Sequence, residues 1–137
     1  MNILLDTNVV LDVALARQPF CQAAEMILDA SDFRRVRLFI TASSATDLYY
    51  VLRKEKGRDV GLRFIRRLLE CVDACGVDKG TLVAALNSDF PDFEDAVQNA
   101  AAIDSQIEII VTRNKADYRT SPLVVLSPDD FVAAHMA

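Results

Sequence analysis

The sequence is poor in the side chains from which many functional sites are built. Its 137 residues include no tryptophan, one histidine and three cysteines. His135 and the cysteines (Cys21, Cys71 and Cys75) are too widely spaced for a four-ligand zinc site, and Cys71 and Cys75 lack the CxxC spacing. We therefore expect reduced thiols in a cytoplasmic protein, and no histidine that acts as a general base.

Long hydrophobic runs are also missing. The uncharged apolar stretches fall far short of the roughly 18 residues that a membrane-spanning helix needs, and no charged leader precedes an apolar segment. No internal repeat, low-complexity segment or linker divides the sequence. Because 52% of the residues are hydrophobic, the chain can bury a substantial core, and we expect one domain over residues 1–137 that does not enter a membrane.

Positive charge is scarce, with 15 Lys and Arg against 20 Asp and Glu and a net charge of -5. This balance argues against broad coating of a nucleic-acid duplex, but phosphate affinity depends on local basic clusters and bound cations. The best candidates for contacts to a nucleic-acid backbone are Arg53, Lys54, Lys56, Arg58, Arg63, Arg66 and Arg67. An ordinary solvated helix face explains the same residues equally well.

Short apolar segments alternate with helical patterns along the chain. Strands are predicted near residues 3–5, 36–41, 106–112 and 124–126, with a weaker one at 71–75. Helices are predicted near residues 9–15, 19–30, 43–56, 58–69, 78–86 and 96–103, with a last one after Ser127. In the helix at 58–69, Leu62, Ile65, Leu68 and Leu69 should make the apolar contacts. The alternation predicts an α/β fold with a central, mostly parallel sheet between two layers of helices.

Carboxylates and amides stand where these strands end. The candidates, in chain order, are Asp6, Asp47, Asp92, Asp95, Asn114 and Asp117. Because the carboxyl ends of parallel strands share one edge of a sheet, these residues should meet there. Carboxylates that gather within a few ångströms raise one another's pKa unless a cation neutralises them, and oxygen ligands suit Mg²⁺ or Mn²⁺. The pattern therefore predicts a hard-metal site.

Helix capping is the alternative explanation for these acids. Asp6 or Asn8 has the right position to cap the helix that follows the first strand. Ser44 and Asp47 have the spacing of a capping box, and Asp92 with Asp95 resembles another cap pairing. Four acids within residues 89–95 exceed what one cap needs.

Four short motifs occur in order across nearly the whole chain. They are Leu4-Leu5-Asp6-Thr7-Asn8, Thr46-Asp47-Leu48, Asp92-Phe93-Glu94-Asp95-Ala96 and Val111-Thr112-Arg113-Asn114. The ordered set resembles the PIN-domain family, and most closely its PilT N-terminus and VapC-type bacterial members. The resemblance implies a compact α/β/α domain, Mg²⁺- or Mn²⁺-dependent endoribonuclease activity on an RNA substrate, a homodimer, and often the role of toxin beside an antitoxin protein.

The resemblance also assigns residues. The first three family acids match, in order, Asp6, Asp47 and Asp95. Asn8 matches a polar residue that supports the first acid, and Thr112 matches the hydroxyl before the fourth position. That fourth position, commonly Asp, is Asn114 here, so either its amide oxygen is a weaker ligand or Asp117 or Asp92 supplies the missing charge. Asn114 is favoured because it lies closer to the end of the strand.

The implied chemistry is hydrolysis of an RNA phosphodiester by metal-activated water, with Asp6, Asp47 and Asp95 holding one or two ions. A PIN fold that has lost catalysis and binds RNA or a protein partner is the alternative, and Asn114 supports it. A haloacid-dehalogenase-like phosphatase needs a second Asp where Asn8 stands. A receiver domain needs paired acids at the end of the first strand, so both of these fit poorly.

Overall fold

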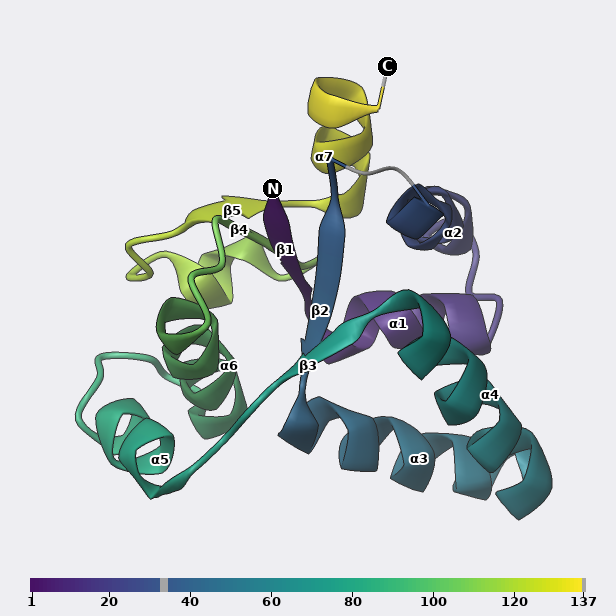
Figure 1. Ribbon diagram of the computed structural model, residues 1–137, viewed down its shortest axis with the longest axis horizontal. Coiled ribbons are helices and arrows are strands. Elements are labelled where there is room, and N and C mark those ends of the chain that lie inside the picture. The colour runs from purple at the N-terminus through teal and green to yellow at the C-terminus, as the bar shows by residue number, and fades with distance from the viewer. Residues whose placement is uncertain (33–34, 137) are drawn as a thin grey trace.

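A five-stranded, entirely parallel sheet forms the centre of the molecule (Figure 1). In this computed structural model, residues 1–32 and 35–136 are described. The strands are β1 (Asn2–Leu5), β2 (Arg37–Thr41), β3 (Asp73–Cys75), β4 (Ile109–Val111) and β5 (Val124–Leu126), in the spatial order β3-β2-β1-β4-β5. The predicted parallel α/β architecture is confirmed, including the weak strand near residues 71–75.

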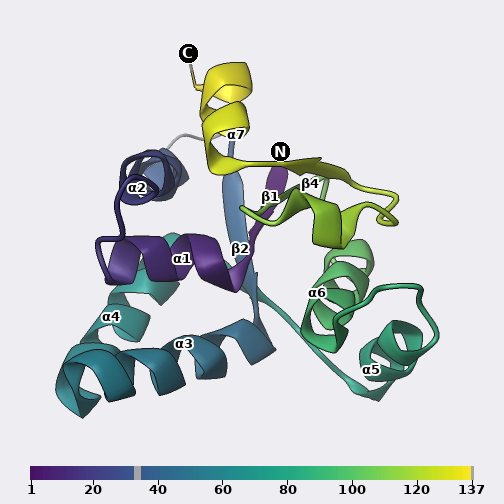
Figure 2. The same cartoon turned by 180° about the vertical axis from the view of Figure 1, so that it is seen from behind.

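Helices cover both faces of this sheet, as the two opposite views show (Figures 1 and 2). One side carries α1 (Thr7–Ala14), α2 (Cys21–Asp29), α3 (Ala42–Lys56), α4 (Arg58–Cys71) and α7 (Pro128–His135). The other side carries α5 (Lys79–Leu86) and α6 (Phe93–Asp104). Two short 3₁₀ helices, η1 (Ala30–Asp32) and η2 (Lys115–Tyr118), complete the elements of the described ranges.

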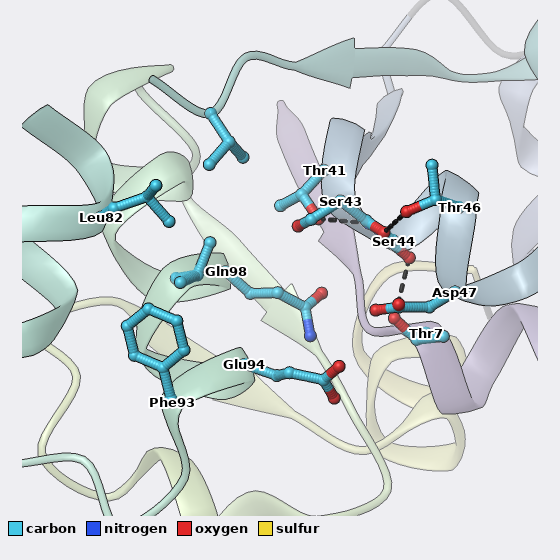
Figure 3. Close-up of a pocket in the computed structure, with 12 residues that line it drawn as sticks. Thr7, Thr41, Ser43, Ser44, Thr46, Asp47, Leu82, Phe93, Glu94 and Gln98 are labelled. Atoms are coloured by element: carbon cyan, nitrogen blue, oxygen red, sulfur yellow. Dashed lines mark hydrogen bonds between the residues drawn. The ribbon is translucent and has the colours of Figure 1, made fainter. Parts of the chain in front are cut away.

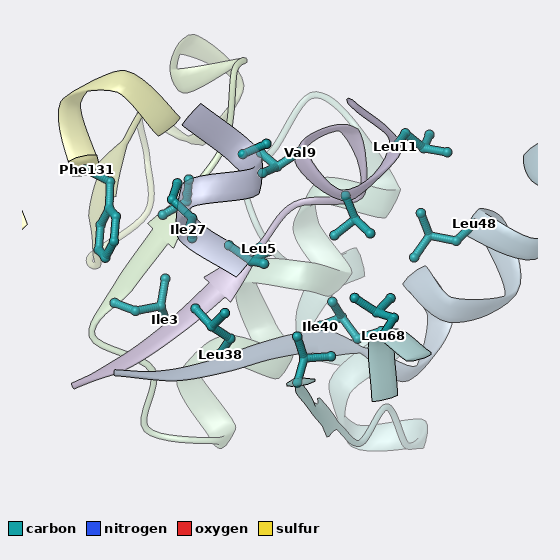
Figure 4. Close-up of a cluster of buried hydrophobic side chains, with 14 of the residues drawn as sticks. Ile3, Leu5, Val9, Leu11, Ile27, Leu38, Ile40, Leu48, Leu68 and Phe131 are labelled. Atoms are coloured by element: carbon teal, nitrogen blue, oxygen red, sulfur yellow. The ribbon is translucent and has the colours of Figure 1, made fainter. Parts of the chain in front are cut away.

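The period of two residues in a strand explains why both faces need a layer of helices. On the first side, Ile3 and Leu5 of β1 are buried in the largest apolar cluster, together with the side chains in Figure 4. Leu4, between them, is buried in a second cluster on the α6 side. Full burial of one such side chain contributes roughly 1.5–3 kcal/mol. The central strand β1 is therefore packed against helices on both faces of the sheet.

Strand register sets where the chain leaves the sheet. Leu5 at the end of β1 pairs with Val111 at the end of β4, and Leu4 pairs with Phe39 in β2. The backbone N–H of Asp6 then donates to the carbonyl of Val111 over 3.0 Å. Because β1 is the middle strand, Asp6 lies at the centre of the carboxyl edge, where open α/β sheets bind their ligands.

The strand predicted at residues 106–112 is shorter than expected. β4 spans only Ile109–Val111. Gln106 has a left-handed φ of 58°, and the N–H of Ile107 donates to the carbonyl of Ala102. The turn that ends α6 thus uses the backbone of these residues, so they are not available for the sheet.

Two helices also differ from the prediction. α6 begins at Phe93 rather than near Ala96, which places Glu94 and Asp95 in its first turn. In α4 the predicted apolar contacts of Leu62 and Leu69 are wrong, since these side chains are 38% and 48% exposed. Phe64, Ile65 and Leu68 face the core instead. Among the helices of the described residues, none has the length and apolar character to cross a membrane.

Candidate active site

Asp6 is a buried carboxylate held by donors from three parts of the chain. Its Oδ1 accepts from Gln98 Nε2 at 2.8 Å, and its Oδ2 accepts from Thr112 Oγ1 at 2.7 Å and from Asn8 Nδ2 at 3.4 Å. Asp6 occupies the N-cap position of α1, but its side chain caps no backbone N–H. The capping alternative is therefore wrong for this carboxylate, which points across the sheet edge toward α6.

A hydrogen-bonded bridge joins Asp6 to Asp95. Gln98 Nε2 donates both to Asp6 and to the Tyr118 hydroxyl, the latter at 3.2 Å. The Tyr118 hydroxyl in turn donates to Asp95 Oδ1 at 3.2 Å. Gln98 and Tyr118 are 5% and 1% exposed, so the bridge is shielded from water. We call Asp6, Gln98, Tyr118 and Asp95 the bridge residues.

Sequence reasoning missed Gln98 and Tyr118. The helical spacing between Asp95 and Gln98 was a usable signal, because residues three apart share one helix face. Tyr118 carried no such signal, since it reaches the site from η2, after the last strand of the motif set.

The pKa of Asp95 is raised to about 7. Desolvation by burial is the largest cause, followed by the charges of Asp6 and Asp92 and, more weakly, of Asp117. The hydrogen bond from Tyr118 acts in the opposite direction and lowers this pKa. Asp95 is therefore poised to take up or release a proton near neutral pH.

Asp47 of α3 meets Glu94 of α6 across the sheet edge, and both carboxylates face the same space (Figure 3). The pKa of Glu94 is raised by desolvation, by the charge of Asp47 and by hydrogen bonding with it, and further by Asp92 and Asp6. Sequence reasoning did not assign Glu94, although it lies inside the acidic run before Ala96. With α6 beginning at Phe93, Glu94 becomes part of the site.

Helix capping accounts for Asp92 but not for Asp47. The Thr41 hydroxyl caps α3 by accepting from the N–H of Ser44 at 3.1 Å, and Asp47 lies one turn further on. The proposed Ser44–Asp47 capping box is therefore wrong. Asp92, in contrast, is the N-cap of α6, and its Oδ1 accepts from the N–H of Asp95 at 3.1 Å. The Asp92–Asp95 cap pairing is confirmed.

The two remaining candidates for the fourth position lie in different surroundings. Asn114 is exposed, and its N–H donates to Thr112 Oγ1 at 3.0 Å. Through this contact Asn114 helps to fix the hydroxyl that supports Asp6. Asp117 is half-buried, and it is close enough for its charge to raise the pKa of Asp95.

The basic candidates lie apart from the acids. Asp47 lies in the first half of α3, whereas the last turn of the helix carries Arg53, Lys54 and Lys56. There they also complement the negative end of the helix dipole. All the basic candidates are exposed, and they continue onto α4 as Arg58, Arg63, Arg66 and Arg67.

A hollow of about 180 Å³ opens beside Asp47 and Glu94, between α3 and α6 (Figure 3). We call it the α3–α6 pocket. One wall presents the hydroxyls of Thr7, Thr41, Ser43, Ser44 and Thr46. The other presents the apolar side chains of Val77, Leu82, Phe93 and Val97. Gln98, one of the bridge residues, also lines it.

The chemistry of these donors suits a hard divalent cation. The acids supply oxygen ligands only. The pKa values of Glu94 and Asp95 are raised by desolvation and, next to it, by repulsion from neighbouring carboxylates, which a cation would relieve. Within residues 1–32 and 35–136, the carboxylate, thiol and imidazole groups form no cluster of three at coordinating distance. The acids instead form two neighbouring groups, the bridged pair Asp6 and Asp95 and the facing pair Asp47 and Glu94.

Fold and site together define a three-layer α/β protein with acidic residues at the carboxyl edge of a parallel sheet. A family model described as the PIN domain matches residues 2–116, and the chain belongs to the PIN domain family. No curated protein matches the sequence.

Several solved structures share the fold. A toxin-antitoxin complex from Klebsiella pneumoniae superposes with a TM-score of 0.70 at 20% identity, covering 92% of this chain and 97% of that one. VapBC-1 from nontypeable Haemophilus influenzae superposes with a TM-score of 0.70 at 15% identity, covering 94% of this chain and 99% of that one. VapC20 of Mycobacterium tuberculosis, a sarcin-ricin loop cleaving toxin, gives 0.69 at 17% identity, covering 89% and 96%.

Proposed function

We propose that this protein is a divalent-metal-dependent endoribonuclease that hydrolyses RNA phosphodiester bonds, and that it is the toxin of a bacterial toxin-antitoxin pair. The observation that carries the proposal is the bridge from Asp6 to Asp95, which holds two carboxylates beside each other at the edge of the sheet. Membership of the PIN domain family supports it. So do the names of the structural neighbours, which include toxin-antitoxin complexes and a toxin that cleaves the sarcin-ricin loop.

In this proposal Asp6, Asp47 and Asp95 hold one or two Mg²⁺ or Mn²⁺ ions, and Glu94 joins them. When bound, the metal supplies a lowered pKa for the attacking water and neutralises charge that develops on the phosphate. Thr112 and Gln98 fix the rotamer of Asp6, so this carboxylate needs no reorganisation when substrate binds. Tyr118 does the same for Asp95.

The basic residues of α3 and α4 would contact the RNA backbone at a distance from the acids. Arg53, Lys54, Lys56, Arg58, Arg63, Arg66 and Arg67 are exposed and available for phosphates. Phosphate contacts position a nucleic acid without reading its sequence. Their neutralisation should therefore weaken RNA binding at low salt more than at high salt.

The proposal also includes protein partners. Neighbours of this fold are toxin-antitoxin complexes, so an antitoxin that covers the acidic edge is expected here. An Arg or Lys of such a partner, inserted among the carboxylates, would form charge-assisted hydrogen bonds and compete with the metal. Its inhibition should weaken as Mn²⁺ rises. A homodimer is the expected assembly of the free protein.

A cleavage assay tests the enzymatic function. The purified protein should cut single-stranded RNA in Mg²⁺ or Mn²⁺ and not in EDTA. Asp95→Asn should lose this cleavage, because the amide removes a charged oxygen ligand from the site. Asp89→Asn is the matched control, since Asp89 is an exposed acid of the same run and should leave cleavage unchanged. Equal turnover by Asp95→Asn and the parent would refute the assignment.

A binding module that has lost catalysis is the second candidate. The observation that favours it is Asn114, an uncharged residue at the fourth position. Such a module would bind RNA or a protein partner without cutting RNA at any Mn²⁺ concentration. Mn²⁺ titration by calorimetry, run on the same preparation as the cleavage assay, separates the two functions.

A further inference from the structure

We propose that the α3–α6 pocket binds one unstacked nucleobase of the RNA, next to the phosphate that is cut. The inference rests on the proposed ribonuclease function and adds a base-recognition site to it. Its starting point is position, because Asp47 and Glu94 belong both to the acidic site and to the lining of the pocket. If the phosphate of a nucleotide lay at these acids, its base would lie beside the pocket that the same two acids line.

The two walls of the pocket match the two kinds of surface on a base. Single-stranded RNA is recognised by stacking of unstacked bases on aromatic rings and by hydrogen bonds to their edges. Phe93 supplies a ring that is 48% exposed, and it forms no aromatic or cation–π pair within the described ranges. Val97 and Leu82 extend this apolar wall.

The opposite wall offers hydrogen-bonding groups at the start of α3. The hydroxyls of Thr41 and Ser43 lie 3.1 Å apart, and those of Thr7 and Ser44 lie 2.8 Å apart. Each hydroxyl has one donor and two acceptor sites, so a paired hydroxyl keeps capacity for a ligand. Thr41 and Ser44 are buried, whereas Thr7 and Ser43 are only half-buried, which leaves the Thr7 and Ser43 hydroxyls the more accessible of these four.

Gln98 adds an unpaired acceptor to the pocket lining. Its Nε2 is used by Asp6 and Tyr118, whereas its Oε1 is buried and has no hydrogen-bond partner in the described part of the chain. A buried acceptor without a donor is unfavourable. An N–H of a bound base, or a water held by it, would offset that deficit.

The size and charge of the α3–α6 pocket argue against other parts of the nucleotide as its occupant. The hollow of about 180 Å³ is smaller than the roughly 300–1,000 Å³ of pockets that enclose drug-sized ligands, so it suits one ring system. Asp47 and Glu94 make its rim negative, which repels a phosphate that no cation accompanies. An uncharged, flat group with polar edges is the occupant that this lining favours.

The first test is the base preference of cleavage. The parent, Phe93→Leu, Ser43→Ala and Ile103→Ala are incubated with a random single-stranded RNA pool in Mn²⁺, and the cut sites are sequenced. Ile103→Ala is the matched control, because Ile103 lies on the same helix and is 45% exposed but does not line the pocket.

The parent should prefer particular bases at one position beside the cut. Phe93→Leu should flatten that preference and lower kcat/KM roughly fivefold or more, mainly through KM, because it keeps an apolar side chain but removes the stacking ring. Ser43→Ala should change which bases are preferred, and Ile103→Ala should change neither. An unaltered preference in both pocket variants, or no preference in the parent, overturns the inference and leaves the ribonuclease function standing.

A binding measurement tests base recognition by the pocket independently of RNA cleavage. Adenosine, guanosine, cytidine and uridine contain no bond that the enzyme could cut, and each is titrated into labelled protein and followed by NMR. At least one should shift the amides of Ser43, Phe93 and Val97, with an affinity that falls about fivefold or more in Phe93→Leu. This result would stand even if the protein cut no RNA, in which case only the proposed function fails.

Two outcomes of that titration would overturn the inference. One is the absence of shifts at the pocket for all four nucleosides. The other is a Phe93→Leu variant that binds nucleosides like the parent but no longer self-associates on a sizing column, which would identify this face as a protein interface.

Discussion

The Tyr118 hydroxyl donates to Asp95 Oδ1 over 3.2 Å, and the hydroxyl oxygen of Tyr118 itself accepts from Gln98 Nε2. A side chain of η2 is thereby tied to the first turn of α6. The contact lowers the pKa of Asp95, against the burial and neighbouring charges that raise it to about 7. Tyr118 is thus a positioning residue that also adjusts when Asp95 ionises.

Tyr118→Phe should shift the pH dependence of cleavage. Without the donated hydrogen bond the pKa of Asp95 rises further, so the acidic limb of the pH–rate profile should move to higher pH. The loss of both hydrogen bonds of the Tyr118 hydroxyl, to Asp95 and from Gln98, should also lower the free energy of unfolding by roughly 1–3 kcal/mol. Tyr50→Phe is the control, because the Tyr50 side chain is 71% exposed. A profile that coincides with the parent's would show that the hydroxyl does not act on Asp95.

Asp95→Asn should change how the metal-free protein's stability depends on pH. The folded-state pKa of about 7 lies above the ordinary value of 3.8, so between these limits the folded protein holds a proton that the unfolded chain has released. The contribution of Asp95 to stability therefore declines as pH rises from about 4 to about 7. Asp95→Asn removes this decline.

Urea unfolding in EDTA at about pH 5 and about pH 8 measures the difference. The free energy of unfolding of Asp95→Asn should exceed that of the parent by more at the higher pH. For Asp89→Asn the difference from the parent should not change with pH. Added Mn²⁺ should stabilise the parent more than Asp95→Asn at the higher pH. A constant difference between parent and variant across the pH range would contradict the raised pKa.

Arg113→Met should destabilise the fold. Arg113 Nε and Nη2 donate to the two oxygens of Asp12 at 2.7 and 3.2 Å, and the guanidinium lies 4.0 Å from the Phe20 ring centroid. Asp12 is completely buried, with Arg17 as its more distant partner at 3.7 Å. Removal of one partner of a buried ion pair costs roughly 3–5 kcal/mol, and we expect about 3 because Arg17 remains.

Urea unfolding with Arg119→Met as the exposed control checks this value. Arg113→Lys should recover only part of the loss, since an ammonium cannot form the two parallel hydrogen bonds of a guanidinium. If Arg113→Met lowered the free energy of unfolding by less than about 1 kcal/mol, the Asp12–Arg113 pair would contribute no more than an exposed ion pair does. Arg17 would then compensate the charge of Asp12 by itself.

Asn114 and Asp117 differ in what they should contribute to metal binding. Asn114 lies closer to the end of β4, which favours it as the residue that completes the metal site. Asp117 is close enough for its charge to raise the pKa of Asp95, which favours Asp117 instead. We expect Asp117→Asn to weaken Mn²⁺ binding about tenfold or more, and Asn114→Asp to tighten it only slightly, because residue 114 is exposed. Calorimetric Mn²⁺ titration of both variants decides between them. A large gain in Asn114→Asp with an unchanged Asp117→Asn would reverse the assignment.

The sequence by itself determined the architecture and the position of the first acid. Ile3, Leu4 and Leu5 form an apolar run with no polar alternation, which is typical of a strand buried on both faces. Such a run must lie between two layers of helices, and the residue after it must emerge at the carboxyl edge. These inferences depend only on local pattern and on the geometry common to parallel sheets, so Asp6 could be placed before any contact was known.

Helix boundaries near the acids were less predictable. Asp92 and Asp95 had the spacing of a cap, and the structure confirms it. Ser44 and Asp47 had the same spacing, yet Thr41 caps α3 instead. Capping by Thr41 and capping by Ser44 both satisfy the same local rule. Which residue caps α3 depends on where β2 ends, and the end of β2 is set by its pairing with β1 and β3.

Only the tertiary structure decided which side chains complete the site. Gln98 and Tyr118 are separated from Asp6 by 92 and 112 positions in the sequence (98−6 and 118−6), and no local pattern links them. They meet because α6 and η2 contribute to the apolar cluster on one face of the sheet, in which Tyr118 packs with Leu4 and Ala101. The direction of a polar side chain depends on which buried donors and acceptors surround it, and that neighbourhood exists only once the layers have packed.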